Sequence, residues 1–354
     1  MAEYHATRAE GERRSTHHPV PTTHHLRLTT FYLLLTTFYL LPCAAQDSLR
    51  LGFWQRAEQP NKARLWALSS TLAVGYAGTT IALDRVWYAG YPRGRFHFFD
   101  DWNGWRQMDK AGHAFTTYFE SKLVGDMYYW AGANRRQAAA AGFATGMLFQ
   151  TTLEMLDGFS TQWGFSWGDM GFNAMGGGLY WGQELLWGEQ RLRLKMSTHR
   201  PRYSTSTLSA INGGTGQTSA EQRAEQLYGR GLGSLLLKEY NGQTIWLSAN
   251  VASFCRERPR WLPAWLNVSV GYGIENVLGA ERNSWRDGEG NVYVAPQYRR
   301  MSQYMISLDV DWERIKVRRP FWRAVLRVLN IFKLPFPTLE INSLGGVRGY
   351  FIYF

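Results

Sequence analysis

Cysteine is nearly absent from this chain of 354 residues, which contains only two, Cys43 and Cys255. A disulfide framework of the kind that small secreted domains use in place of a core is therefore excluded. Charged residues are also scarce, at 19% of the sequence, whereas aromatic residues reach 15%. This balance favours a protein that touches a bilayer or carries large aromatic surfaces.

Several familiar functional patterns are missing too. No His-x-x-x-His or Glu-x-x-His pair of the kind that holds zinc or two irons is present, so we expect no cofactor and assign no metal ligands. Lys and Arg outnumber Asp and Glu by 39 to 28, which gives a net charge of +11. The basic residues form no stripe with interleaved aromatics, so nucleic acid is not an expected partner.

The N-terminal segment has the pattern of a signal peptide. An apolar run, 29–41, precedes a proline and two small residues that end at Ala45, which predicts cleavage after Ala45 and export. Cys43 raises the alternative of a lipidated cysteine, but the proline before it stands where a small residue is required. We therefore expect a leader over 1–45 and a mature chain whose one cysteine, Cys255, has no partner.

Apolar stretches of helical length follow the leader and predict a bundle of about four helices within a helical domain, 46–196. The first stretch is long enough for a membrane span, but its Ser, Thr and Gly content suits a buried helix equally well. Gly142 and Gly146 are four residues apart, which predicts that a neighbouring helix approaches closely. The expected helices cover 63–83, 109–130, 135–156 and 166–187.

The composition changes after the helices. Residues 197–237 begin rich in Ser, Thr, Gly and Asn and are expected to form a linker or surface loop. The C-terminal region, 238–354, should contain antiparallel strands and one short basic amphipathic helix over 320–332, so the predicted fold class is α+β. The expected strands are 244–254, 266–274, 304–312 and 338–342.

Acidic, amide and histidine residues interrupt the apolar helices. Such groups are unfavourable among apolar residues unless they meet one another, so we expect one buried polar site. His113, Asp109, Glu154 and Asp169 are the candidates for acid/base catalysis. The candidates for binding are Asp157, Ser160, Ser166, Asn173 and Trp167.

Four interpretations of these residues stay open. The leading one is a hydrogen-bonded network that fixes helix register, with Asp109 and Ser166 as caps and Lys110 compensating acid charge. The others are a pocket for a lipid headgroup or saccharide, an acid/base site and a divalent metal site. Neither Ser160 nor Ser166 has the context of a nucleophile elbow.

The spaced motifs resemble a known family. Asp109-Lys-x-Gly-His113, then Glu154-x-x-Asp157-Gly, then Gly164-Phe-Ser-Trp-Gly-Asp169 and Asn173-x-x-Gly176 are similar to YfiM-like predicted periplasmic lipoproteins. More distantly, the motifs resemble VanZ-like membrane proteins. The first resemblance implies a location in the envelope of a Gram-negative bacterium but no established reaction.

Two functions are therefore expected. The first is a non-catalytic binding or structural role in the cell envelope, at the membrane, with membrane lipid or cell-wall glycan as partner. The alternative is an acid/base or metal-assisted hydrolase that acts on a lipid-linked envelope substrate.

Overall fold

The computed structural model of the protein describes residues 52–86 and 93–354. The expected leader, its cleavage site and Cys43 lie outside the described residues. The remaining cysteine, Cys255, is free and partly buried.

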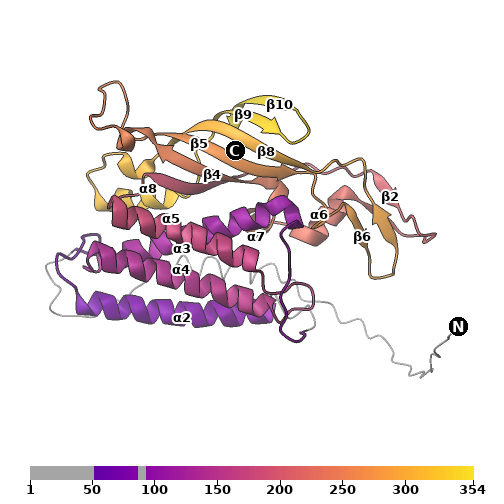
Figure 1. Cartoon of the computed structure of the whole chain (residues 1–354), viewed down its shortest axis with the longest axis horizontal. Helices are drawn as coiled ribbons and strands as arrows, with labels where there is room; N and C mark the ends of the chain where they lie inside the picture. The colour runs from indigo at the N-terminus through magenta and orange to yellow at the C-terminus, as the bar shows by residue number, and fades with distance from the viewer. Residues whose placement is uncertain (1–51, 87–92) are drawn as a thin grey trace.

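Four helices form the bundle that the apolar segments predict (Figure 1). Asn134 caps one of them. Its side chain accepts a hydrogen bond from the Gln137 backbone N–H, and the Gln137 side chain accepts one from the Asn134 backbone N–H. Ser166 caps another by accepting a hydrogen bond from the backbone of Asp169. Among the described residues, no helix has the length and apolarity needed to cross a membrane. The bundle helices are α2 (Lys62–Val86), α3 (Met108–Trp130), α4 (Arg135–Asp157) and α5 (Trp167–Leu186).

Glycines let α3 pack closely against its two neighbours. A Cβ on Gly142 would lie 2.2 Å from the Ser121 carbonyl oxygen, and one on Gly146 would lie 2.5 Å from the Ser121 hydroxyl. The close approach predicted from these two glycines is therefore confirmed for α4 and α3. On α5, a Cβ on Gly176 would lie 2.0 Å from the carbonyl oxygen of Ala114. These contacts hold the polar residues of α3, α4 and α5 near one another.

The C-terminal half contains a six-stranded antiparallel sheet whose strand order follows the chain, so the α+β prediction is confirmed. In Figure 1 the sheet lies over α5 and α3, and α2 lies on the side of the bundle away from it. The strands are β1 (Leu192–Thr198), β4 (Gln243–Asn250), β5 (Leu266–Glu275), β8 (Met301–Val310), β9 (Phe336–Asn342) and β10 (Val347–Tyr353).

Shorter elements connect the strands. The segment expected to be a linker, 197–237, holds the end of β1, the hairpin of β2 (Thr207–Ser209) and β3 (Gln217–Ser219), and two helices. Ser219 caps the first of these helices by accepting from the Gln222 backbone. The two helices of this segment are α6 (Ala220–Tyr228) and α7 (Leu232–Leu237). The basic amphipathic helix lies later in the chain, between β8 and β9, and is α8 (Pro320–Leu329). The remaining elements are the hairpin of β6 (Ser284–Arg286) and β7 (Val292–Val294) and the 3-10 turns η1 (Gly104–Gln107), η2 (Tyr240–Gly242), η3 (Val251–Phe254) and η4 (Trp312–Arg314).

The sheet is curled, and its inner face is polar. The hydroxyls of Thr244 on β4 and Tyr353 on β10 lie 2.9 Å apart, although three strands separate β4 from β10. Inside the curl, the ammonium of Lys195 lies 2.8 Å from Asp309, and both side chains are fully buried. Trp246 fills much of the remaining space. We call this inner face the concave face and the outer one the convex face.

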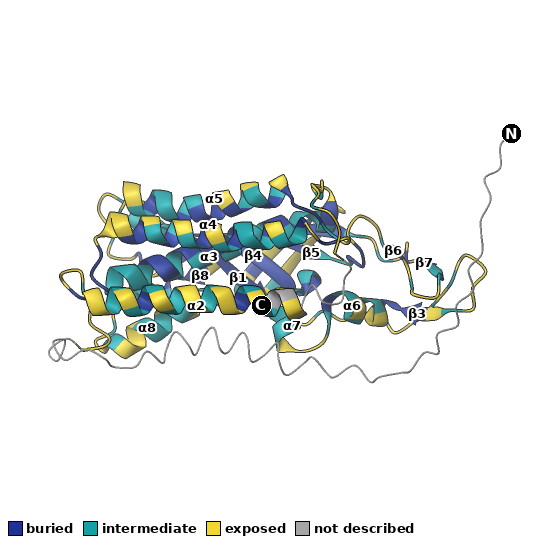
Figure 2. Cartoon of the chain, turned by 90° about the horizontal axis from the view of Figure 1, so that it is seen from below, coloured by how far each residue is buried: buried dark blue, intermediate teal, exposed yellow. Residues whose placement is uncertain are grey.

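The helix bundle covers one edge of the convex face. Leu194 of β1 packs against a cluster that includes Tyr118 of α3 and Tyr180 of α5. Met196 of β1 packs in a second cluster with Met108 of α3. Burial is therefore greatest between bundle and sheet, whereas Figure 2 shows exposed residues along the outer sides of α2, α4 and α5.

Candidate functional site

Residues from three helices and the preceding connection meet at one end of the bundle. The four catalytic candidates from the sequence come together here, because Nε2 of His113 lies within 4.0 Å of a carboxylate oxygen of Asp109, Glu154 and Asp169. We call the full set the His113 cluster. It consists of Asp101, Asp109, Lys110, His113, Glu154, Ser166, Asp169 and Asn173.

Lys110 lies at the centre of the acidic side of the cluster. Its ammonium is 2.8 Å from both Asp101 and Asp169, and only 1% of the side chain is exposed. Burial by itself would lower the pKa of Lys110, but hydrogen bonds and attraction from Asp101 and Asp169 raise it. Lys110 is therefore a permanent cation that joins the segment before η1 to α5.

Ser166 links the start of α5 to the end of α4. Its hydroxyl donates to Asp101 over 2.7 Å and accepts from the Asp169 backbone over 3.1 Å. Its own N–H donates to Glu154 over 3.2 Å. Gly164 to Gly168 has the spacing Gly-x-Ser-x-Gly, but Ser166 is buried and occupied as a helix cap. It therefore has no free hydroxyl for nucleophilic attack.

His113 faces three carboxylates. Its Nδ1 donates to the Asn173 side-chain oxygen over 3.1 Å, and that oxygen also accepts from Thr117 over 2.8 Å. Its Nε2 lies 3.7 Å from Glu154, 3.9 Å from Asp169 and 4.0 Å from Asp109. These distances are too long for direct hydrogen bonds, so Nε2 is held among negative charges without being bound to one of them.

Burial and neighbouring charges raise the pKa values of His113, Glu154 and Asp169. Burial would lower the pKa of His113, but Asp109, Asp169 and Glu154 outweigh it and raise the value. Burial raises the pKa of Glu154 to about 8, against the attraction of His113. Burial also raises the pKa of Asp169 to about 6, although His113 and Lys110 oppose this. The cluster thus holds protons near neutral pH, as acid/base sites do.

Asp101 behaves differently from Asp169, although both contact Lys110. Burial raises the pKa of Asp101, but hydrogen bonds from Lys110 and Ser166 are among the effects that outweigh it and lower the value. Asp169 is the more buried of the two, with 6% of its side chain exposed against 17%. Asp101 therefore stays ionised to a lower pH than Asp169 does.

Two buried atoms of the cluster have no hydrogen-bond partner among the described residues. They are Oε1 of Glu154 and Nδ2 of Asn173. A buried polar atom without a partner costs about 1–3 kcal/mol, so each marks a place where a ligand or water gains a bond. His113 and Asp109 are partly exposed, with 18% and 24% of their side chains accessible. The cluster is therefore reached from the surface.

Exposed aromatic rings lie beside this opening. Trp167 begins α5 and stacks on Phe98, with ring centres 6.1 Å apart, and the two residues are 67% and 61% exposed. Trp102 follows Asp101 and lies against Phe172 of α5. Exposed tryptophan and phenylalanine next to a polar site are typical of surfaces at the edge of a membrane.

Asp157 is the last residue of α4, and Ser160 follows in the connection to α5. The carbonyl of Asp157 accepts from the backbone of Ser160, and the Ser160 hydroxyl accepts from the backbone of Gln162. Asp157 also acts on the His113 cluster through its charge, because its carboxylate is one of the groups that raise the pKa of Glu154. The predicted binding roles of Asp157 and Ser160 stay predictions, as does that of Trp167.

Two residues that contact the candidates were missed in the sequence. Asp101 stands in an irregular aromatic connection before η1 and gave no periodic signal. Tyr240 donates to Asp109 from 131 positions away, a contact that sequence spacing does not indicate. The expectation that Asp109 caps its helix is wrong, because the N-cap is Gln107 and Asp109 lies in the first turn.

A metal ion is compatible with part of the cluster. One ligand atom each from Asp109, His113 and Asp169 lie within 4.8 Å of one another. One imidazole with two carboxylates suits a divalent cation. The ammonium of Lys110 on Asp169 opposes a second positive charge there.

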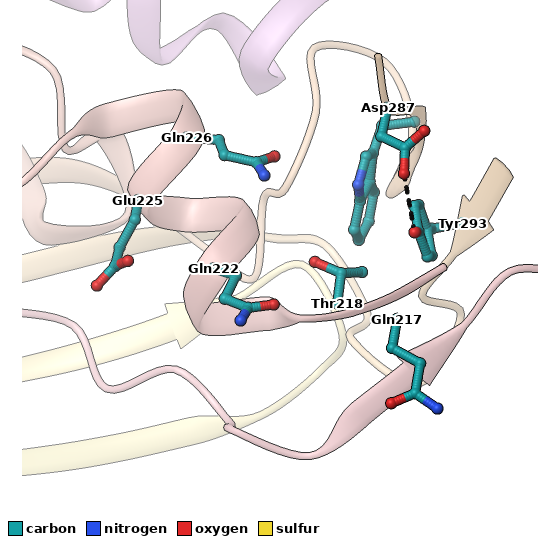
Figure 3. Close-up of a pocket in the computed structure, with 8 residues that line it drawn as sticks. Gln217, Thr218, Gln222, Glu225, Gln226, Asp287 and Tyr293 are labelled. Atoms are coloured by element: carbon teal, nitrogen blue, oxygen red, sulfur yellow. Dashed lines mark hydrogen bonds between the residues drawn. The ribbon is translucent and has the colours of Figure 1, made fainter. Parts of the chain in front are cut away.

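Two clefts lie away from the cluster. One of about 480 Å³ opens between α6 and the β6–β7 hairpin and is lined mainly by polar side chains, including Gln217, Gln222 and Asp287 (Figure 3). Another of about 310 Å³ lies between the bundle and the segment around η4, where Arg135 and Arg314 line it. Neither cleft is lined by His113.

Residues 98–181 match the model of a family described as "Predicted periplasmic lipoprotein (DUF2279)". The match covers η1, α3, α4 and most of α5, and thus every residue of the His113 cluster. The resemblance expected from the motifs is therefore confirmed over this segment, and it is consistent with an exported envelope protein. No curated protein and no solved structure matches the chain. The similarity to VanZ-like proteins stays a prediction.

Proposed function

We propose that the protein binds the polar headgroup of a membrane lipid at the His113 cluster, in the periplasm of a Gram-negative bacterium. The observation that carries this proposal is the pair of buried, unpartnered atoms, Oε1 of Glu154 and Nδ2 of Asn173. Nδ2 of Asn173 donates a hydrogen bond, whereas Oε1 of Glu154 accepts one when the carboxyl is ionised and donates one when it is protonated. A hydroxyl group both donates and accepts, so a hydroxyl-bearing headgroup satisfies the two atoms together.

The surroundings of the cluster support a lipid over a soluble ligand. The exposed rings of Phe98 and Trp167 stand beside the polar opening, where the first carbons of an acyl chain would lie. A rigid aromatic surface next to hydrogen-bonding groups matches the change from polar to apolar along a lipid molecule.

Titration with dihexanoyl phosphatidylglycerol below its micelle concentration tests this proposal, because a soluble short-chain lipid presents the headgroup without a bilayer. Glu154→Gln keeps the shape of the side chain but replaces the carboxyl group, to which the headgroup would bond, with an amide. We expect this change to lower the affinity for the lipid at least roughly tenfold. Glu120→Gln is the matched control. Glu120 is another carboxyl whose pKa burial raises to about 8, but it bonds to Gln150 and lies outside the cluster.

The proposal fails if the wild-type protein does not bind the short-chain lipid, or if both glutamine variants bind it as the wild type does. Binding to isolated cell-wall sacculi that Glu154→Gln abolishes, without lipid binding, would identify glycan as the ligand instead.

A second candidate function is acid/base or metal-assisted hydrolysis of a lipid-linked substrate. His113 Nε2 lies 3.7 Å from the unpartnered Oε1 of Glu154, and the raised pKa values of both groups suit proton transfer near neutral pH. Titration with Zn²⁺ and Mn²⁺ tests the metal branch, since Asp109→Asn should abolish binding while Glu120→Gln preserves it. If the site is an acid/base catalyst, the wild-type protein should hydrolyse a lipid-linked substrate. His113→Gln should abolish this hydrolysis but keep the affinity for the lipid.

A further inference from the structure

The convex face of the sheet is apolar where the bundle does not cover it. Side chains from four neighbouring strands lie in register, as in the row Leu247, Val270, Ile306 and Leu339. Each is between 36% and 66% exposed. The uncovered convex face consists of Leu247, Val268, Val270, Tyr304, Ile306, Leu308, Leu339, Ile341 and Val347.

This arrangement reverses the usual sidedness of an antiparallel sheet, which buries its apolar face and exposes its polar one. Along β8, Gln303, Ser307 and Asp309 are buried whereas Ile306 and Leu308 are exposed. The concave polar groups are bonded to one another: Asp309 accepts from Ser248, and Glu340 accepts from Gln303. These polar groups therefore find partners within the protein, whereas the apolar side is left to the surroundings.

The helix bundle does not cover these exposed rows of apolar side chains on the convex face. It packs on β1 through Leu194 and Met196 and on the end of β5 at Ile274. Over β5, β8 and β9, no element of the described chain packs on the convex face closely enough to bury Val270, Ile306 or Leu339. Contiguous apolar patches of this kind mark a surface that another apolar phase covers.

One end of the sheet is strongly basic. β4 ends where β5 begins and β8 ends, because Asn250 pairs with Asn267 and Leu266 pairs with Val310. The segments 251–265 and 311–319 therefore emerge at the same end. They carry the exposed basic residues Arg256, Arg258, Arg260, Lys316, Arg318 and Arg319, against one exposed acid, Glu257.

Tryptophans accompany these charges. Trp261 is 79% exposed and Trp265, directly before β5, is 37% exposed. An apolar surface that ends in tryptophan and arginine matches the boundary between the acyl chains and the headgroups of an anionic bilayer. A second copy of this chain would bring a second cationic end, so it would not neutralise the basic residues as anionic lipid headgroups would.

We propose that the uncovered convex face docks on the acyl region of an anionic lipid bilayer, with the basic end of the sheet at the headgroups. This docking does not depend on the His113 cluster. It is an interaction surface of the C-terminal half, outside residues 98–181 that match the family model.

Flotation with vesicles of phosphatidylcholine, with and without phosphatidylglycerol, tests the docking of the full chain. Ile306→Asp places a charge in the middle of the face, and we expect vesicle partition to fall roughly tenfold or more. Ile211→Asp is the matched control, because Ile211 is 65% exposed in the β2–β3 connection. We expect it to partition as the wild type does, and omission of phosphatidylglycerol to weaken binding of both.

Three outcomes would overturn the proposal. The first is equal partition of Ile306→Asp and the wild type. The second is a lowered melting temperature of Ile306→Asp without vesicles, which would mean that the protein itself covers the face. The third is a wild-type dimer that Ile306→Asp converts to a monomer in sedimentation, which would identify a second copy as the occupant.

The same vesicles separate this inference from the proposed headgroup site. Glu154→Gln should lose affinity for the short-chain lipid but still partition onto vesicles through the sheet. Ile306→Asp should lose vesicle partition but keep its affinity for the short-chain lipid. Either result can fail without the other.

Discussion

Lys110→Met tests whether the His113 cluster depends on one buried cation. The ammonium of Lys110 lies 2.8 Å from Asp101 and from Asp169, with 1% of the side chain exposed. Methionine keeps most of the length and volume but leaves both carboxylates without that cation. Removing one partner of a buried ion pair costs about 3–5 kcal/mol. Because 17% of Asp101 is exposed and water compensates part of its loss, we expect the lower part of this range.

Urea unfolding of the full chain, followed by tryptophan fluorescence at pH 7.5, measures this loss. Adding Asp169→Asn to Lys110→Met removes one of the two stranded charges, so the double variant should be more stable than the single variant. Lowering the pH should also reduce the loss, because Asp169 takes up a proton as the pH falls. The reasoning is refuted if Lys110→Met costs less than about 1 kcal/mol, well below the range for a buried pair, or if the double variant regains nothing.

Three further perturbations follow from the geometry. Burial raises the pKa of Glu154 from 4.5 to about 8, so the folded state holds this proton more tightly and its contribution to stability is lost as the pH rises from 4.5 through 8. Glu154→Gln should therefore flatten the melting temperature between pH 5 and 9, and an unchanged slope would contradict this. A Cβ on Gly176 would meet the backbone of α3, whereas one on Gly178 meets nothing within 4 Å. Gly176→Ala should therefore cost at least about 2 kcal/mol in thermal unfolding. Gly178→Ala should be neutral or should stabilise the protein by up to about 1 kcal/mol, because alanine has the higher helix propensity, and equal effects of the two changes would argue against close packing. Tyr240→Phe removes the bond to Asp109 and should lower the free energy of unfolding in urea by about 1.5–3 kcal/mol. An unchanged free energy of unfolding would contradict this.

The helical half was largely predictable because its signals are local. The predicted helix 109–130 is α3 within one residue, and Ser166 caps α5 as its spacing with Asp169 indicates. The meeting of His113, Glu154 and Asp169 followed from the cost of isolated polar groups among apolar residues. What these groups do chemically is not encoded in such spacing.

Other features depend on contacts between distant positions. Tyr240 reaches Asp109, and Tyr272 of β5 donates to the backbone of Arg106, across more than a hundred residues in each case. Alternation in β8 predicted a strand, but the pattern has the same period whichever face is buried. The sequence therefore did not show that the apolar side chains of the sheet lie on its exposed, convex face. Ser, Thr and Gly in 197–237 suggested a loop, although Ser219 begins a helix there.

The order of the strands along the chain has a consequence for how the molecule folds. From β4 onward, each strand pairs with the strand that follows it in the sheet, and the longest connections between them are residues 276–300 and 311–335, so the strands can be added one at a time. β1 is the exception, because residues 199–242 must be accommodated before it meets β4. Until then β4 offers an open edge and the bundle lacks its partner, so we expect this single long-range pairing to limit the folding rate and to be the step most prone to aggregation.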